Sequence, residues 1–86
     1  MIKRKEFKGW LESNTNYSEA SINDVVSRMV RADRIFEWTP KETYVYYLER
    51  NEEFEKVSVS VKSQIRKAAK LYFDFYKSSF PDEIEK

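Results

Sequence analysis

The chain of 86 residues contains no cysteine and no histidine. The absence of cysteine excludes disulfide bonds and thiolate chemistry. The absence of histidine removes the commonest general base and the commonest metal ligand. Nucleophilic catalysis therefore lacks the side chains that form its usual dyads, and no carboxylates are spaced like a metal site. We expect a protein that is not an enzyme and that uses no cofactor, no metal and no small-molecule substrate.

Glycine and proline are also scarce, with one and two residues respectively. Few helix breakers interrupt the chain, which favours long helices over a turn-rich β fold. A single glycine cannot form a glycine-rich phosphate loop. No apolar run is long enough to span a membrane, and the basic start "MIKRK" continues into charged residues rather than into a signal-peptide apolar region. We therefore expect a cytoplasmic protein that does not contact a membrane.

Charged residues are abundant, and their signs are segregated along the chain. The net charge is only +1, so the molecule as a whole is not strongly attracted to polyanions. By segment, the net charge is +2 over residues 1–36, −4 over 37–55, +5 over 56–79 and −2 over 80–86. This distribution predicts one basic and one acidic face. The alternative, that these are ordinary solvated faces, stays open.

Periodic apolar residues indicate four helices joined by short loops. Their expected ranges are 2–12, 18–36, 40–51 and 59–79. A chain of this length forms one domain, and its predicted fold class is all-α, a small four-helix bundle. Pro81 should end the last helix. The domain would then cover residues 1–80, with a tail or the start of a linker over residues 81–86.

Three of the helix starts carry capping residues. Ser18 is expected to cap the second helix, and either Ser58 or Ser60 the fourth. The segment 39–42, "TPKE", has the pattern of a capping box with proline at the first helical position. It predicts that the third helix begins at this proline.

The longest predicted helix has an apolar side and a basic side. The expected core side consists of Val61, Ile65, Ala68, Ala69, Leu71, Tyr72, Phe75 and Tyr76. The opposite side carries Ser63, Arg66, Lys67, Lys70, Asp74 and Lys77. In the rest of the chain, the expected core residues are Phe7, Trp10, Leu11, Ile22, Val25, Val26, Met29, Val30, Phe36, Tyr44, Val45, Tyr47, Leu48 and Phe54.

The second predicted helix also carries a basic stripe, formed by Arg28, Arg31 and Arg34. Each guanidinium donates hydrogen bonds in a planar fork that suits a phosphate group. The alternative is a solvated face whose arginines pair with acids such as Asp24. If the second and fourth helices pack side by side or cross, this stripe would share one surface with the cations of the fourth helix, which are Lys62, Arg66, Lys67 and Lys70.

Three polar residues near the start of the fourth helix complete the candidate DNA-binding site. Ser60 and Ser63 carry short hydroxyl groups that suit phosphate contacts at a helix N-terminus. Gln64 can reach a base edge. The sequence therefore predicts a duplex-binding surface that combines two basic stripes with these polar side chains.

The order of four motifs resembles the N-terminal core-binding domain of phage integrases and tyrosine recombinases. The motifs are "FKGWL", "YSEASINDVVSRM", "TPKETYVYYLER" and "SVSVKSQIRKAAKLYFDFY". The resemblance spans about residues 4–78, and its motifs are helical patterns rather than a catalytic signature. The matching residues are Phe7, Trp10, Leu11, Ser18, Ser21, Ile22, Thr39, Glu42, Tyr47, Leu48, Ser58, Val61, Arg66, Leu71, Phe73 and Phe75.

The resemblance implies a four-helix, SAM-like domain that grips one side of duplex DNA during DNA integration and recombination. In that family, the second and fourth helices face the DNA, and a separate catalytic domain grips the other side. The residues of that catalytic domain are absent here, so strand cleavage is not implied. The chain would be either one domain of a longer recombinase, with a downstream catalytic domain as partner, or a small phage or mobile-element protein that kept only this module.

A protein-interaction module is the rival interpretation, for example a small phage regulator or inhibitor. It is motivated by the acids Glu49, Glu52, Glu53 and Glu55, which lie together in the sequence, and by the aromatic side chains expected at the surface, since so short a chain can hardly bury them all. A purely structural homodimer is a third possibility.

Overall fold

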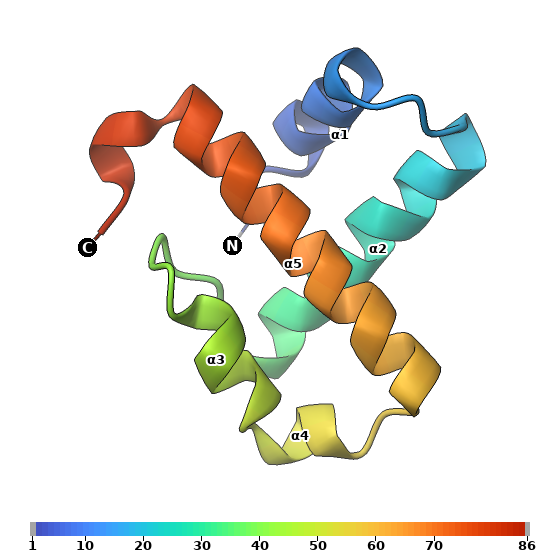
Figure 1. Cartoon of the computed structure of the whole chain (residues 1–86), viewed down its shortest axis with the longest axis vertical. Coiled ribbons are helices and arrows are strands. Elements are labelled where there is room, and N and C mark those ends of the chain that lie inside the picture. Colours follow the sequence, from blue (N-terminus) through green and yellow to red (C-terminus); the bar gives the residue numbers. More distant parts are fainter. Residues whose placement is uncertain (1, 86) are drawn as a thin grey trace.

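A computed structural model of the chain describes residues 2–85. It contains the helices α1 (Arg4–Asn14), α2 (Glu19–Ile35), α3 (Tyr44–Glu49), α4 (Glu52–Glu55) and α5 (Val59–Ser79), and the 3-10 turn η1 (Pro81–Glu83) (Figure 1). Within the described residues there is no strand, only an isolated bridge between Lys41 and Glu85. The predicted all-helical class is confirmed.

Helices α2 and α5 form the centre of the molecule. They cross as an X in Figure 1, with α5 in front of α2. Helix α1 packs against both of them, and the short helices α3 and α4 lie beside the lower half of the X. Because the helices are arranged around one crossing, the molecule is a slab with principal extents of 33 × 32 × 17 Å.

The two long helices begin where their serine caps predict. The Ser18 hydroxyl accepts a hydrogen bond from the Ser21 amide at 3.2 Å. The Ser58 hydroxyl accepts one from the Val61 amide at 3.3 Å, so Ser58 and not Ser60 caps α5. Each cap satisfies one of the amides that have no partner inside the first helical turn.

The prediction of a single third helix over residues 40–51 is wrong in two respects. The helix begins later, and the segment forms two short helices, α3 and α4. No capping box forms: α3 begins at Tyr44, with Thr43 at the N-cap position and no side-chain cap. Helix α3 stops before Asn51, whose side-chain oxygen accepts from the Glu53 amide at 2.9 Å and whose side-chain nitrogen donates to the Ile35 carbonyl at 3.2 Å. Asn51 therefore follows the end of α3 and caps α4, and the same side chain is tied to the end of α2.

The core is a set of aromatic rings gathered around α5. The Tyr72 ring lies 5.0 Å from Phe7 and 4.8 Å from Trp38, both edge-on, and its hydroxyl accepts a hydrogen bond from the Lys3 amide at 2.9 Å. Edge-to-face pairs at these distances add to the stabilisation from burial alone. Trp38 was not assigned to the core by periodicity, since it lies outside the helices, yet it is buried and its ring centroid is 4.5 Å from that of Tyr76.

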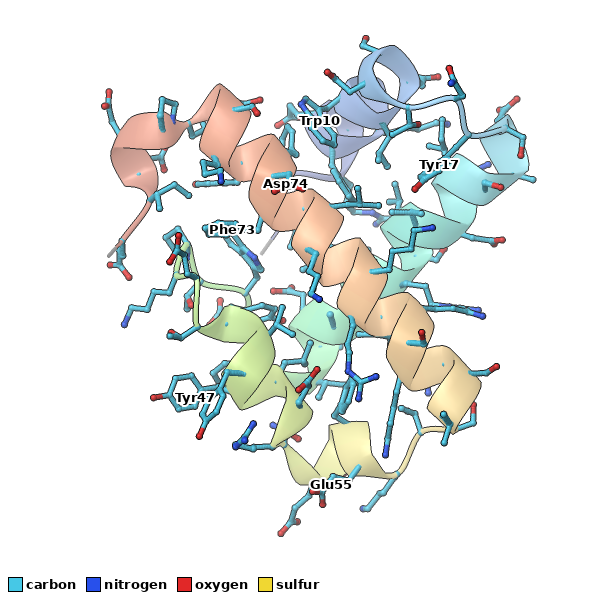
Figure 2. The ribbon with its side chains drawn as sticks, viewed as in Figure 1. Trp10, Tyr17, Tyr47, Glu55, Phe73 and Asp74 are labelled. Carbon is cyan, nitrogen blue, oxygen red and sulfur yellow. The ribbon has the colours of Figure 1, made fainter. Side chains whose placement is uncertain are left out.

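Most of the predicted core residues are buried or half-buried, including Phe54, which is 1% exposed. Trp10 is half-buried, with its ring edge-on to Phe75 at 6.1 Å. Tyr47 is the exception. It is 55% exposed and points away from the body of the molecule (Figure 2), because the core side of α3 is filled by Tyr44 and Leu48.

The segment expected to be a tail or a linker folds back onto the loop before α3. The Tyr76 hydroxyl donates to the Glu83 carboxylate at 2.8 Å. The Glu85 amide donates to the Pro40 carbonyl at 2.7 Å, and the Glu85 carboxylate lies 3.8 Å from the Lys41 ammonium. Residues 81–85 thus cover one edge of the slab.

Candidate nucleic-acid interface

One solvent-exposed side of α5 gathers five of the ten candidate residues, and a sixth joins them from α2. Lys67 and Lys70 are exposed and lie one helical turn apart. Arg28 reaches across from α2 and donates to the side-chain oxygen of Gln64 at 2.7 Å. We call this surface the α5 face, and its members are Arg28, Ser60, Ser63, Gln64, Lys67 and Lys70.

Two carboxylates, those of Asp24 and Asp74, lie near the cations of the α5 face. Lys67 shares a hollow with Arg28 and Asp24, and a second hollow with Lys70 and Asp74. The Lys67 ammonium also lies 5.1 Å from the centre of the Tyr17 ring, a cation–π distance. Asp74, labelled on α5 in Figure 2, closes the basic stripe toward the C-terminal end of the helix. The two aspartates therefore reduce the positive charge of the α5 face, Asp24 beside Arg28 and Asp74 beyond Lys70.

Arg66 and Lys62 lie on the flank of α5 that faces the short helices. Arg66 forms an ion pair with Glu49 of α3, and its guanidinium lies 5.5 Å from the centre of the Phe54 ring. The Lys62 ammonium lies 6.0 Å from the same ring. Both side chains are half-buried. They join α5 to α3 and α4, so they are less available to a ligand than their place in the stripe predicts. Arg66 nevertheless also lines the hollow that Lys67 and Lys70 share.

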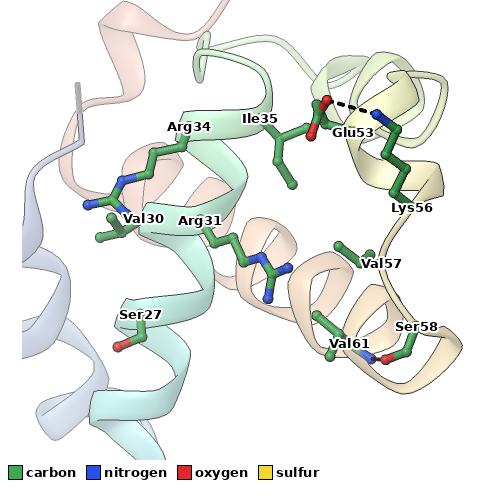
Figure 3. A pocket seen from close by; sticks show the side chains of 10 residues that line it. All are labelled: Ser27, Val30, Arg31, Arg34, Ile35, Glu53, Lys56, Val57, Ser58 and Val61. Atoms are coloured by element: carbon green, nitrogen blue, oxygen red, sulfur yellow. Dashed lines mark hydrogen bonds and ion pairs between the residues drawn. The ribbon is translucent and has the colours of Figure 1, made fainter.

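Arg31 and Arg34 lie in a different place, a groove between α2 and the segment that leads into α5 (Figure 3). The groove has a volume of about 820 Å³. Its third cation is Lys56, which forms an ion pair with Glu53 at 3.3 Å on the surface. We call this surface the α2 groove; it is lined by Ser27, Val30, Arg31, Arg34, Ile35, Glu53, Lys56, Val57, Ser58 and Val61.

Lys56 is a cation of the groove that sequence analysis did not select. The only indication of Lys56 in the sequence is its position at the beginning of the basic segment 56–79. It precedes the helix, so no periodic stripe includes it.

The structure does not bring the two basic stripes together in one surface. Val61, which lines the α2 groove, lies on the same side of α5 as the buried Ile65. Lys67 and Lys70 lie on the opposite, exposed side. The reason is geometric: each stripe is opposite the apolar side of its own helix, and when two helices pack through their apolar sides, these stripes point away from each other. Only Arg28, on the flank of α2, reaches the α5 face.

Three tyrosines outside the two basic surfaces have pKa values above the ordinary 10.0. Burial is the largest cause in each case, because it disfavours the charged phenolate. In Tyr76 the pKa rises to about 12, and the hydrogen bond to Glu83 adds to the shift. These groups belong to the core rather than to a reactive site.

Within residues 2–85, no group of three or more acidic side chains is arranged to hold a metal ion. Every helix in the same range is too short or too polar to cross a membrane.

Comparisons with protein-family models, with curated proteins and with solved structures each gave no match to this chain. The likeness to integrase core-binding domains therefore rests on the sequence motifs.

Proposed function

We propose that the protein is a non-enzymatic module that binds duplex DNA through the α5 face, of the type found at the N-terminus of phage integrases. The observation that carries the proposal is the position of Lys67 and Lys70, which are exposed on one side of α5 with Arg28 beside them. Cations in this arrangement can contact successive phosphates, and such contacts provide most of the sequence-independent affinity for DNA.

The hydrogen bond between Arg28 and Gln64 orients the glutamine. Its side-chain oxygen accepts from Arg28 at 2.7 Å, and the amide NH2 keeps its two donors. We propose that these donors contact a phosphate oxygen or an acceptor on a base edge, and that Ser60 and Ser63 donate to phosphates.

The proposed family likeness also assigns the helices. In this proposal α1, α2 and α5 correspond to the first, second and fourth helices of a SAM-like core-binding domain. The third helix of that domain would correspond to α3 and α4 together, divided by Asn51. The role in DNA integration and recombination, for a phage or mobile element, would then depend on a catalytic domain or protein partner that is not in this chain.

The test compares two double variants that remove equal charge. Lys67→Gln with Lys70→Gln should weaken binding to a labelled duplex by at least about tenfold at low salt, measured by fluorescence anisotropy. The slope of log K against log salt should become shallower by about 1.8, because two phosphate contacts are lost. The control is Lys5→Gln with Lys8→Gln on α1, which has the same spacing and should leave both quantities nearly unchanged.

Two results would contradict the proposal: no duplex binding by the natural chain at low salt, or an equal loss in the two double variants. Arg66 is not used in this test. Its ion pair with Glu49 joins two helices, so a change there would mix binding with stability.

A protein-interaction module is the second candidate, and one observation favours it. Tyr46 and Tyr47 are 51% and 55% exposed, with their rings edge-on at 5.2 Å, and the Arg50 guanidinium lies 3.5 Å from the centre of the Tyr46 ring. Tyrosine and arginine are enriched among residues that dominate binding energy in protein interfaces. The acids Glu52 and Glu55, on the neighbouring helix α4, are also exposed.

Affinity capture can separate the two candidates if nucleic acid is first digested. A protein captured by the natural chain and by the Lys67→Gln, Lys70→Gln variant, but lost with Tyr46→Ser and Tyr47→Ser, would support the interaction module. Capture that disappears with nuclease treatment would support DNA binding.

A further inference from the structure

We infer that the α2 groove is a second, independent polyanion site, and that one molecule therefore bridges two DNA duplexes. This inference rests on the proposed function, because it assumes that the α5 face binds one duplex. It adds a second binding surface and a second copy of the same ligand.

The groove carries positive charge that no carboxylate pairs. Arg31 and Arg34 are exposed, and within residues 2–85 neither forms an ion pair with a carboxylate. Lys56 and Glu53 neutralise each other in part through their surface pair. Arg31 extends into the groove, whereas Arg34 lies at its α2 rim and extends away from Val57 (Figure 3). The planar donors of Arg31 are thus open to a ligand in the groove, and arginine is well suited to bidentate phosphate binding.

The shape of the groove decides which ligand it admits. It is an open depression between a helix and a connecting segment, not an enclosed cavity (Figure 3). Arg31 lines it on the α2 side and Ser58 on the other side. The Ser58 oxygen accepts from the Val61 amide, so its proton remains available to a phosphate oxygen. An open depression with donors on both sides admits an extended backbone of phosphates.

One duplex cannot occupy both surfaces. Val61 in the groove and Lys70 on the α5 face project from opposite sides of α5, and the molecule is 17 Å thick along its shortest axis. DNA has a persistence length of about 50 nm, so a short duplex is straight on the scale of this protein and does not wrap around it. The two surfaces must therefore take two duplexes.

The experiment counts duplexes and tests their joining. A biotinylated duplex on beads is incubated with the protein and with a second, fluorescent duplex, and titrations give the number of duplexes bound per chain. The natural chain should saturate at two duplexes and retain the fluorescent one. Arg31→Gln with Arg34→Gln should saturate at one duplex and lose at least about 90% of the retained fluorescence, while its affinity for a single duplex falls less than about threefold.

Two further variants make the result specific. Lys67→Gln with Lys70→Gln should also abolish bridging, since it removes the other surface. Lys56→Gln, a milder change in the groove, should reduce bridging by less, because Lys56 is already paired with Glu53. Lys5→Gln with Lys8→Gln is the control and should bridge as the natural chain does.

Three outcomes would overturn the inference. Saturation at one duplex per chain, with the groove variant equal to the control, would remove the second site and leave the proposed function standing. Bridging that persists in the groove variant, together with a dimer in light scattering, would assign the joining to dimerisation. Absence of binding to any single duplex would contradict the proposed function, and the inference with it.

Discussion

At the scale of single residues, Trp38 has an unusual environment. Its side chain is buried, and its indole N–H has no hydrogen-bond acceptor within the described part of the chain. An unsatisfied buried donor costs about 1–3 kcal/mol. Its ring nevertheless contacts Tyr44, Tyr72 and Tyr76. In this side chain, ring packing stabilises the fold and the unpaired N–H destabilises it.

Trp38→Phe separates these two effects. The variant keeps an aromatic ring and removes the unpaired N–H, so we expect the free energy of unfolding to change by less than about 1 kcal/mol. Trp38→Ala removes the ring itself and should cost about 3–5 kcal/mol. Urea denaturation of both variants checks this. A loss in Trp38→Phe as large as that in Trp38→Ala would show that the packing of the full indole outweighs the cost of its unpaired N–H.

Gly9 lies in the middle of α1, and a methyl group added there would meet no atom within 4 Å. Alanine loses less conformational freedom than glycine when a helix forms. We expect Gly9→Ala to raise the free energy of unfolding by about 0.5–1 kcal/mol, measured by thermal or urea denaturation. A decrease would mean that α1 needs the freedom of glycine for a reason other than space.

At the scale of helices, the start of α5 depends on one of two neighbouring serines. Ser58 caps the helix and Ser60 lies on the exposed α5 face. Ser58→Ala should lower the free energy of unfolding by about 1 kcal/mol, and Ser60→Ala should have almost no effect. If DNA binds as proposed, Ser60→Ala should weaken the affinity for a duplex. A loss of stability with Ser60→Ala would contradict the assignment of the cap to Ser58.

The long helices could be predicted from the sequence because two independent signals agree in them. Apolar residues recur with the helical period, and a serine precedes each helix. The third helix lacked such agreement: "TPKE" has capping residues, but the Pro40 carbonyl instead accepts from the Glu85 amide. That contact joins residues far apart in the sequence, which no local pattern contains.

The candidate site was predictable to a similar extent. Periodicity identified the basic stripes on α2 and α5, and the structure keeps Lys67 and Lys70 exposed. It could not show that Arg66 would pair with Glu49, nor that Arg31 would lie in a separate groove. The direction of a stripe relative to another helix depends on how the helices cross, and a single helix carries no information about that angle.

At the scale of the whole molecule, the buried tyrosines link stability to alkaline pH. Their folded-state pKa values lie above the ordinary 10.0, with that of Tyr76 at about 12. The unfolded chain therefore releases these protons at lower pH than the folded protein. The contribution of these tyrosines to the free energy of unfolding should be constant below about pH 10. It should fall as the pH rises from about 10 through 12.

Urea midpoints at pH 8 and pH 11 test this dependence. Tyr76→Phe should reduce the loss between the two pH values, because one of the groups that ionise on unfolding is gone. Glu83→Gln keeps the Tyr76 ring and a hydrogen-bond acceptor but removes the carboxylate charge. The loss of stability between pH 8 and pH 11 should therefore be larger in Glu83→Gln than in Tyr76→Phe. A loss that is unchanged in Tyr76→Phe would assign the alkaline transition to Tyr44 and Tyr72 alone.

The thinness of the slab has a consequence for electrostatic screening. The Debye length is about 8 Å at 0.15 M ionic strength and about 30 Å at 0.01 M, whereas the shortest extent of the molecule is 17 Å. Two duplexes held on its opposite sides would repel each other through the protein in dilute salt and hardly at all near physiological ionic strength. Added salt relieves this repulsion while it weakens each phosphate contact, so the ratio of bridged to singly bound duplex should fall less steeply with salt than the affinity of the groove for a single duplex.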